Sequence, residues 1–266
     1  MKAIFHKLSR LLFPPRCVAC KSLMPLDGEE MCDECKGAYT QAKETQCPRC
    51  VKPMHQCDCT SRFLIGRSLP VMVKLYRYRP SLPHLPQNRL IFRLKQANAE
   101  SVAHFLAKEL AGSIKRHIEP GKSYVLVGVP RSKSSIRKYG YDHVSVLLKH
   151  LSKELGIPVV VAVERYGKEG EQKRKNRAER MKAAAHSFRP VNDISLKGKS
   201  VILVDDVVTS GATFASCAKA VRILGARGVI CAVVGSSFGY GDIAERKVYE
   251  SVRHEIMRRS LMRLSR

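Results

Sequence analysis

The chain has 266 residues, of which 44% are hydrophobic and 27% charged, and this composition excludes full disorder, a collagen helix and a pure disulfide scaffold. Lysine and arginine total 48 against 23 acidic residues, so the net charge of +25 favours polyanionic partners such as nucleic acid, phosphate compounds or an anionic membrane surface. No apolar run approaches the roughly 18 residues that a membrane helix needs. Residues 1–15 are interrupted by basic side chains and end in two prolines, and no small-residue cleavage site follows. We therefore expect a cytoplasmic protein without a signal peptide.

Cysteine usage divides the chain into unequal parts. Eight of the ten cysteines lie within residues 17–59, and the other two stand alone far downstream. We expect a cysteine-rich module over residues 1–66, which opens with a short amphipathic helix or turn at 3–13. An α/β domain over residues 67–240 and a basic C-terminal helix or tail over residues 241–266 should follow.

The α/β part shows alternating strand and helix patterns. β-Branched and apolar runs predict strands at 69–78, 123–129, 158–163, 201–204 and 228–234. Apolar residues at helical spacing predict helices at 90–95, 99–117, 144–155 and 213–224. Residues 169–185 are polar and very basic, which fits an exposed helix or a mobile flap. Strands that alternate with helices predict a mostly parallel sheet with helices on its faces.

The clustered cysteines form four close pairs, which suit tetrahedral zinc because a short turn can bring two sulfurs to one metal. Sequential pairing predicts two four-cysteine sites, formed by Cys17, Cys20, Cys32 and Cys35 and by Cys47, Cys50, Cys57 and Cys59. Interleaved pairing, a single zinc ion, disulfides and an iron–sulfur cluster are the alternatives. Disulfides are disfavoured in a cytosolic chain, where thiols stay reduced. A closed four-cysteine site leaves no open position, so we expect structural zinc. Cys217 and Cys231 fall on apolar faces and should be core residues.

Residues 201–213 read VILVDDVVTSGAT, an apolar strand followed by two acids, a small-residue turn and the start of a helix. Backbone N–H groups and the dipole at a helix N-terminus favour an anion. The expected phosphate loop consists of Thr209, Ser210, Gly211, Ala212 and Thr213. Its hydroxyls add donors, and Gly211 allows close approach of a phosphate. Asp205 and Asp206 lie where the hydroxyls of a ribose would be if its 5′-phosphate occupied the loop.

This stretch resembles the 5-phosphoribosyl 1-diphosphate (PRPP) motif of type I phosphoribosyltransferases. The whole arrangement resembles the ComF family, in which a double zinc ribbon precedes a phosphoribosyltransferase-like domain. The lead-in LFPPRC at 12–17, the LIFRLK stretch at 90–95 and the strand end at 128–130 carry the resemblance beyond the loop. It implies an α/β type I phosphoribosyltransferase-like fold with a small N-terminal zinc-ribbon module.

The basic segment after Pro130 differs from the family pattern. The family usually shows Arg-Gly-Phe-Asn-Gln there, whereas this chain has Tyr-Gly-Tyr-Asp-His at 139–143. Arg131 and Lys133 follow the predicted strand and are the candidate ligands of a pyrophosphate group, which cations would neutralise. They suit a nucleic-acid backbone equally well. The spacing of His143 and His186 does not distinguish them from ordinary surface or core histidines.

Two hypotheses of function remain open at this point. In the first, the protein binds PRPP with Mg²⁺ and, if active, is a phosphoribosyltransferase whose catalytic residues the sequence does not identify. In the second, it is a non-catalytic protein that binds single-stranded nucleic acid or a helicase partner, with the phosphate loop as a sensor or anchor. The resemblance to the ComF family implies a role in natural competence and DNA uptake.

Overall fold

The structure is a computed structural model that describes residues 14–26, 29–96, 99–132, 134, 136–137, 140–166 and 187–238. Its elements follow one another as α2 (Asp33–Glu44), the 3₁₀ turn η1 (Met54–Gln56), α3 (Arg62–Ile65), β1 (Met72–Arg77), α4 (Pro86–Leu94), α5 (Glu100–Lys115), β2 (Ser123–Gly128), α7 (His143–Leu155), β3 (Val163–Arg165), β4 (Phe188–Pro190), β5 (Lys199–Val208), α9 (Ala212–Ile223) and β6 (Gly228–Ser236). Within these residues, no helix has the length and apolar character needed to cross a membrane.

The central sheet has four parallel strands in the order β1-β6-β5-β2. Strand β5 lies between β2 and β6 because its register pairs Val201 with both Val125 and Val229. The strands are parallel, so all four end at one edge, which we call the carboxyl edge. Ligands of open α/β sheets bind beyond this edge.

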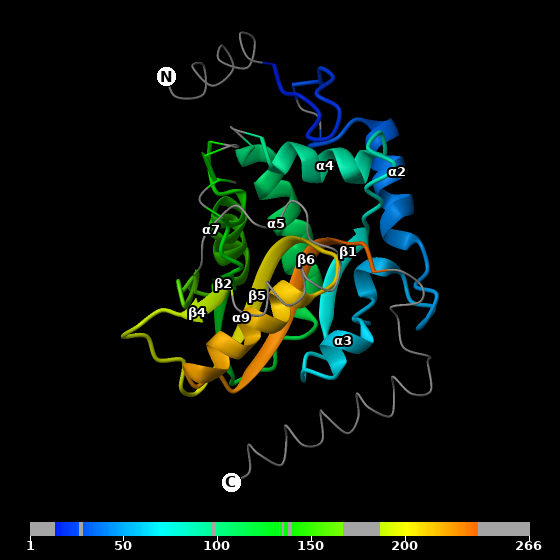
Figure 1. The fold of residues 1–266 in the computed structure, drawn as a ribbon. Helices are drawn as coiled ribbons and strands as arrows, with labels where there is room; N and C mark the ends of the chain where they lie inside the picture. Colours follow the sequence, from blue (N-terminus) through cyan, green and yellow to red (C-terminus); the bar gives the residue numbers. More distant parts are fainter. Residues whose placement is uncertain are drawn as a thin grey trace.

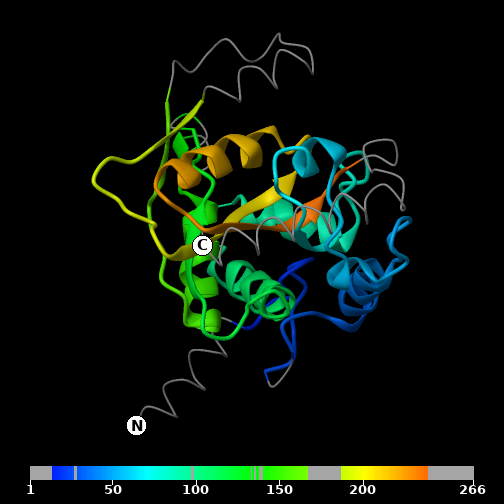
Figure 2. The same cartoon turned by 90° about the horizontal axis from the view of Figure 1, so that it is seen from below.

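Helices cover both faces of the sheet, as expected from the alternating pattern. Helices α4, α5 and α7 pack on one face against β-strand residues such as Ile202 and Val204. Helix α9 covers the other face, where Phe214 and Val221 pack against Val201 and Leu203. Figure 1 labels the elements, and Figure 2 shows α9 on one side of the sheet with the helices of the other layer opposite. Successive strand residues therefore enter two different core layers.

The cysteine-rich segment packs directly on this α/β layer. Tyr39 of α2 contacts Tyr76 of β1 and Phe105 of α5, with ring centroids 5.9 and 5.3 Å apart. Arg93 of α4 donates hydrogen bonds to the carbonyls of Cys17 and Val18, at 2.8 and 2.5 Å. The cysteine-rich segment and the sheet thus share buried contacts across the expected boundary near residue 66.

The elements differ from the sequence expectations in several places. Strand β5 does not end before the acids but continues through both of them to Val208. Only a single bridge, from Val159 to Leu126, and the short β3 form in the region 158–163, and β3 pairs antiparallel with the unpredicted β4. Helix α2 was not predicted either. The expected segments at 3–13, 169–185 and 241–266 lie outside the described residues.

Candidate functional site

The phosphate loop lies at the carboxyl edge between β5 and α9. Gly211 is the N-cap of α9 and has a φ of 82°, in the left-handed region that glycine adopts without strain. The Ala212 N–H donates to the Ser210 hydroxyl at 3.3 Å, and the Ala215 N–H donates to the Gly211 carbonyl at 3.0 Å. Thr209 is exposed and Thr213 is half-buried. The turn therefore presents hydroxyl groups and the positive end of the α9 dipole at one place, which suits an anion.

Gly211 also lies against the cysteine-rich segment. A Cβ atom at this position would approach Cγ and Cδ1 of Leu64 to 2.7 Å. Leu64 belongs to α3, which directly follows the last cysteine pair, and its side chain is fully buried. The zinc-ribbon segment thus forms one wall of the phosphate loop.

The two acids of the motif lie side by side in β5 but face opposite layers. Asp205 faces α9, where it interacts electrostatically with Cys217, and one of its carboxyl oxygens accepts a hydrogen bond from the Asp206 N–H at 2.9 Å. Burial and the neighbouring Asp206 raise the pKa of Asp205 well above its ordinary value. Asp205 is therefore protonated more easily than an ordinary carboxyl group, because two adjacent buried negative charges disfavour each other.

Asp206 is buried on the other face of the sheet, beside three basic side chains. Lys95 Nζ lies 2.7 Å and His143 Nε2 lies 3.5 Å from its Oδ2, and Arg131 Nη1 lies 3.8 Å from its Oδ1. Burial alone would raise the pKa of Asp206, but His143 and Lys95 outweigh it and hold the pKa below its usual range. The cluster brings Lys95 from the end of α4, Arg131 from the segment after β2 and His143 from α7 to one point at the carboxyl edge.

Most of the expected loop residues and Arg131 meet at this edge, whereas Lys133 lies outside the described residues. Sequence reasoning gave no role to Lys95 or His143, which contact Asp206 from other elements. Lys95 ends the LIFRLK stretch as the C-cap of α4, and that position was its only signal. His143 occupies the position at which the ComF family usually has Gln, and this difference was the only sequence signal for His143.

The eight clustered cysteines form two separate tetrads, as sequential pairing predicts. All sulfurs lie within 4.8 Å of one another in the set Cys17, Cys20, Cys32 and Cys35 and in the set Cys47, Cys50, Cys57 and Cys59. The Cys20 and Cys32 sulfurs are 3.7 Å apart. Tetrahedral zinc with bonds of about 2.3 Å requires sulfurs about 3.8 Å apart, so the first tetrad fits zinc. Four thiolates in each set indicate two closed sites.

A buried lysine supports the second tetrad. Lys74 of β1 donates hydrogen bonds from Nζ to the carbonyls of Cys57, Cys59 and Met72, at 3.0, 2.7 and 3.1 Å. Its positive charge offsets the negative charge of the thiolates. Its hydrogen bonds attach the turn from Cys57 to Cys59 to the central sheet. By contrast, Cys217 and Cys231 are fully buried core residues, as predicted.

Comparison with known proteins agrees with this geometry. Residues 98–241, just over half of the chain, match the phosphoribosyl transferase domain family, and residues 8–63 match the double zinc ribbon domain. Competence protein ComFC of Bacillus subtilis is 26% identical over 195 residues, which cover 70% of this chain and 75% of the relative. Ribose-phosphate pyrophosphokinase of Sulfurisphaera tokodaii is 27% identical over 176 residues, which cover 59% of this chain and 56% of the relative.

Two solved structures show partial similarity. A hypoxanthine-guanine phosphoribosyltransferase from Bacillus anthracis has a TM-score of 0.34 at 16% identity, covering 52% of this chain and 70% of that chain. The glutamine PRPP amidotransferase from B. subtilis has a TM-score of 0.35 at 20% identity, covering 60% of this chain and 34% of that chain. From its family match and its paired cysteine tetrads, the chain belongs to the phosphoribosyl transferase domain family and carries a double zinc ribbon ahead of that domain, the combination that the resemblance to the ComF family predicts.

Proposed function

We propose that this protein binds PRPP, or a related ribose 5-phosphate, at the carboxyl edge of its sheet. The 5′-phosphate occupies the loop from Thr209 to Thr213, and the ribose hydroxyls meet the acid pair. Arg131, with Lys133 beside it in the sequence, neutralises the diphosphate.

The observation that carries this proposal is the convergence of a glycine-capped helix N-terminus, a buried acid pair and a cation from the adjacent strand. Gly211 caps α9, Asp205 and Asp206 precede it in β5, and Arg131 reaches to 3.8 Å from Asp206 out of the segment after β2. The strands β2 and β5 are direct neighbours in the sheet. A ligand with phosphate groups at both ends and a sugar between them matches this order of charges.

Magnesium belongs to the ligand in this proposal. Mg²⁺ prefers oxygen ligands and is commonly held by substrate phosphates with one or two carboxylates. Asp206 already faces Lys95, Arg131 and His143, which disfavours a cation on that carboxylate. We therefore assign Mg²⁺ to the diphosphate and ribose oxygens of PRPP, with Asp205, which forms no ion pair within 4.0 Å among the described residues, as the protein carboxylate beside them.

The chemistry that this site can support is transfer of ribose phosphate to an acceptor. Developing positive charge on the sugar would be stabilised by the acid pair, and the leaving diphosphate by Arg131. Rate enhancement would come mainly from positioning and charge stabilisation. We assign no general acid or base.

The roles of loop and cation can be separated by comparing two ligands. Arg131→Gln should weaken PRPP binding by tenfold or more while leaving ribose 5-phosphate binding nearly unchanged, because only PRPP carries the diphosphate. Arg227→Gln is the matched control, since Arg227 is exposed and precedes β6 at the opposite edge of the sheet. Calorimetric titrations measure both affinities. An equal loss for the two ligands in Arg131→Gln would contradict the assignment of Arg131 to the diphosphate.

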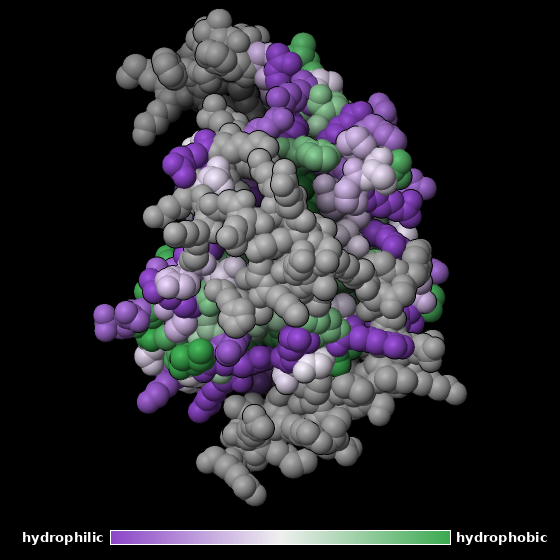
Figure 3. Space-filling view, in the orientation of Figure 1, coloured by the Kyte–Doolittle hydropathy of each residue, from purple (hydrophilic) through white to green (hydrophobic). Residues whose placement is uncertain are grey.

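The net charge of +25 and the ComFC relative favour a second candidate, a cytoplasmic role in competence in which the protein binds single-stranded DNA. Hydrophilic residues, purple in Figure 3, occupy much of the described surface on the face seen there. A strand that contacts several cations releases counterions, so its affinity falls steeply with salt. A filter-binding series over salt concentration tests this candidate, and a flat salt dependence would remove it. The basic residues expected to contribute at 169–185 lie outside the described residues.

A further inference from the structure

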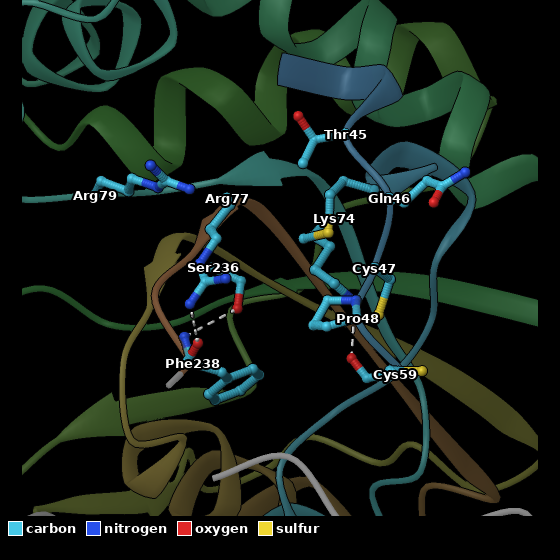
Figure 4. Close-up of a pocket in the computed structure, with 11 residues that line it drawn as sticks. Thr45, Gln46, Cys47, Pro48, Cys59, Lys74, Arg77, Arg79, Ser236 and Phe238 are labelled. Carbon is cyan, nitrogen blue, oxygen red and sulfur yellow. Dashed lines mark hydrogen bonds between the residues drawn. The ribbon is translucent and has the colours of Figure 1, made fainter. Parts of the chain in front are cut away.

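A cleft lies between the second cysteine tetrad and the carboxyl ends of β1 and β6 (Figure 4). The empty space that it encloses, with the open mouth included, is about 510 Å³. One wall comes from the cysteine-rich segment at Thr45, Gln46 and Pro48, and the other from the sheet at Arg77 and Phe238. Neither part of the chain forms this cleft alone.

The charge of the cleft is positive. Lys74, Arg77 and Arg79 line it, and none of its eleven described lining residues is acidic. Lys74 is buried and donates to backbone carbonyls, whereas Arg79 is exposed at the mouth. Arg77 is half-buried and donates from Nη2 to the Phe238 carbonyl at 3.4 Å, which holds its guanidinium beside the opening. Two guanidinium groups at one mouth suit a phosphate, which accepts their hydrogen bonds in pairs.

The rest of the lining is largely apolar. Pro48 is exposed, while Met54 and Phe238 are buried. In Figure 4 the Pro48 and Phe238 rings lie on two sides of the opening, with the Arg77 side chain above Phe238. Proline and aromatic rings offer flat faces against which a planar group can pack, and arginine can stack on the same group. An anionic group joined to a planar ring therefore matches the cleft.

The cleft is separate from the phosphate loop but touches the same segment of chain. Strand β1 is two positions from β5 in the sheet, which corresponds to about 10 Å at the usual strand spacing. Ser236 and Phe238 line the cleft, and Ser237 between them contacts the end of β5. The Ser237 N–H donates a hydrogen bond to the Val208 carbonyl at 2.9 Å. The cleft and the loop are thus neighbours along the carboxyl edge.

We propose that this cleft is a nucleotide-binding site, in which Arg77 and Arg79 hold a phosphate and the base lies against Pro48, Met54 and Phe238. The nucleotide is either a free mononucleotide or one unit of a single strand, since the cleft is open at its mouth. This site does not depend on PRPP binding, and the two ligands occupy different residues.

Adenosine 3′-monophosphate is the probe, because it lacks the 5′-phosphate that the loop is proposed to take. Calorimetry with the full-length, zinc-loaded protein should detect its binding, while adenosine and inorganic phosphate alone should bind at least tenfold more weakly. Arg77→Gln combined with Arg79→Gln should weaken binding of the probe by tenfold or more. Arg227→Gln, at the opposite edge of the sheet, should leave binding of the probe within about twofold.

Circular dichroism and zinc content verify that each variant folds. If the double variant does not fold, Arg79→Gln alone replaces it, because the Arg79 guanidinium has no ion-pair partner among the described residues. Absence of probe binding, an affinity that the Arg79 and Arg77 changes do not alter, or an equal loss in Arg227→Gln would overturn the proposal. If a short oligodeoxynucleotide displaces the probe, the site binds a unit of a single strand. If the probe stays bound in the presence of the oligodeoxynucleotide, the site binds free nucleotides.

Discussion

Replacement of Gly211 by alanine should destabilise the protein through two effects that can be separated. Gly211 has a φ of 82°, and a Cβ there would lie 2.7 Å from two carbon atoms of Leu64. The left-handed conformation costs a non-glycine residue about 1–2 kcal/mol, and an overpacked contact typically costs about 1–3 kcal/mol. Because Leu64 is fully buried and cannot move into solvent, both effects should apply. We expect the free energy of unfolding to fall by about 2–5 kcal/mol.

Gly198→Ala is the matched control for the backbone effect. Gly198 has a φ of 77°, but nothing lies within 4 Å of a Cβ built there. It should cost only about 1–2 kcal/mol, so the difference between the two variants measures the contact with Leu64. Urea unfolding followed by circular dichroism provides both values.

A double-mutant cycle tests the same contact directly. Leu64→Ala alone should cost about 2–5 kcal/mol for the cavity, but the double variant should be more stable than the sum of the two changes by about 1–3 kcal/mol. Equal costs for Gly211→Ala and Gly198→Ala, together with an additive double variant, would refute the claim that the zinc-ribbon segment packs against the phosphate loop.

Four further predictions concern the buried charges and the metal sites. Asp206→Asn should cost about 3 kcal/mol of stability because Lys95 loses its buried partner. Asp205→Asn should cost about 1 kcal/mol or less, because burial beside Asp206 already disfavours the charged form of that carboxyl. Urea titrations compare the two variants. Since the folded-state pKa of Asp206 is lowered, its contribution is present at neutral pH and is lost as the pH falls below about 4, so Asp206→Asn should flatten the acid limb of the stability profile, and an unchanged limb would contradict the ion pairs. Lys74→Met should cost about 1–3 kcal/mol and release zinc from the second tetrad at lower chelator concentration while the first tetrad is unaffected, and equal release from both would argue against its role. Elemental analysis should find two zinc ions per chain and one in Cys57→Ser, whereas one ion in the unaltered protein would contradict paired sites.

The sequence predicted the layered α/β architecture because the hydrophobic periodicity agreed with the residues that begin and end helices and strands along most of the domain. Helix α7 illustrates this agreement. Asp142 caps its first turn by accepting from the Val144 and Ser145 N–H groups, and Gly156 ends it in the left-handed conformation. Both signals are local, so they can be read without knowledge of the fold.

Features that depend on tertiary packing were missed. Helix α2 has only two buried residues, Cys35 and Tyr39, so its apolar pattern was too sparse to identify. The acids in β5 were expected to follow the strand, because a charged pair rarely lies within one. They lie within it because β6 continues to pair with β5 up to Val208, and because Lys95 forms an ion pair with Asp206 while His143 lies beside the same carboxylate. Those partners are far away in the sequence and no local pattern identifies them.

The double zinc ribbon has a wider role than holding its own short segment together. Lys74 connects the second tetrad to β1, and Leu64 of α3 lies on the loop glycine. Ile65, its neighbour, packs with the cysteines of that tetrad. The metal site, the strand edge and the phosphate loop therefore form one continuous set of contacts, and the cleft of Figure 4 opens within it.

Calorimetric titration of the zinc-loaded protein with PRPP, in the presence and absence of Mg²⁺, tests the central claim most directly. The proposed site predicts binding in the micromolar range that requires Mg²⁺ and is lost in Asp205→Asn combined with Gly211→Ala. Failure to bind PRPP under either condition, with zinc present and the fold intact, would contradict the assignment of a ribose-phosphate site to this loop.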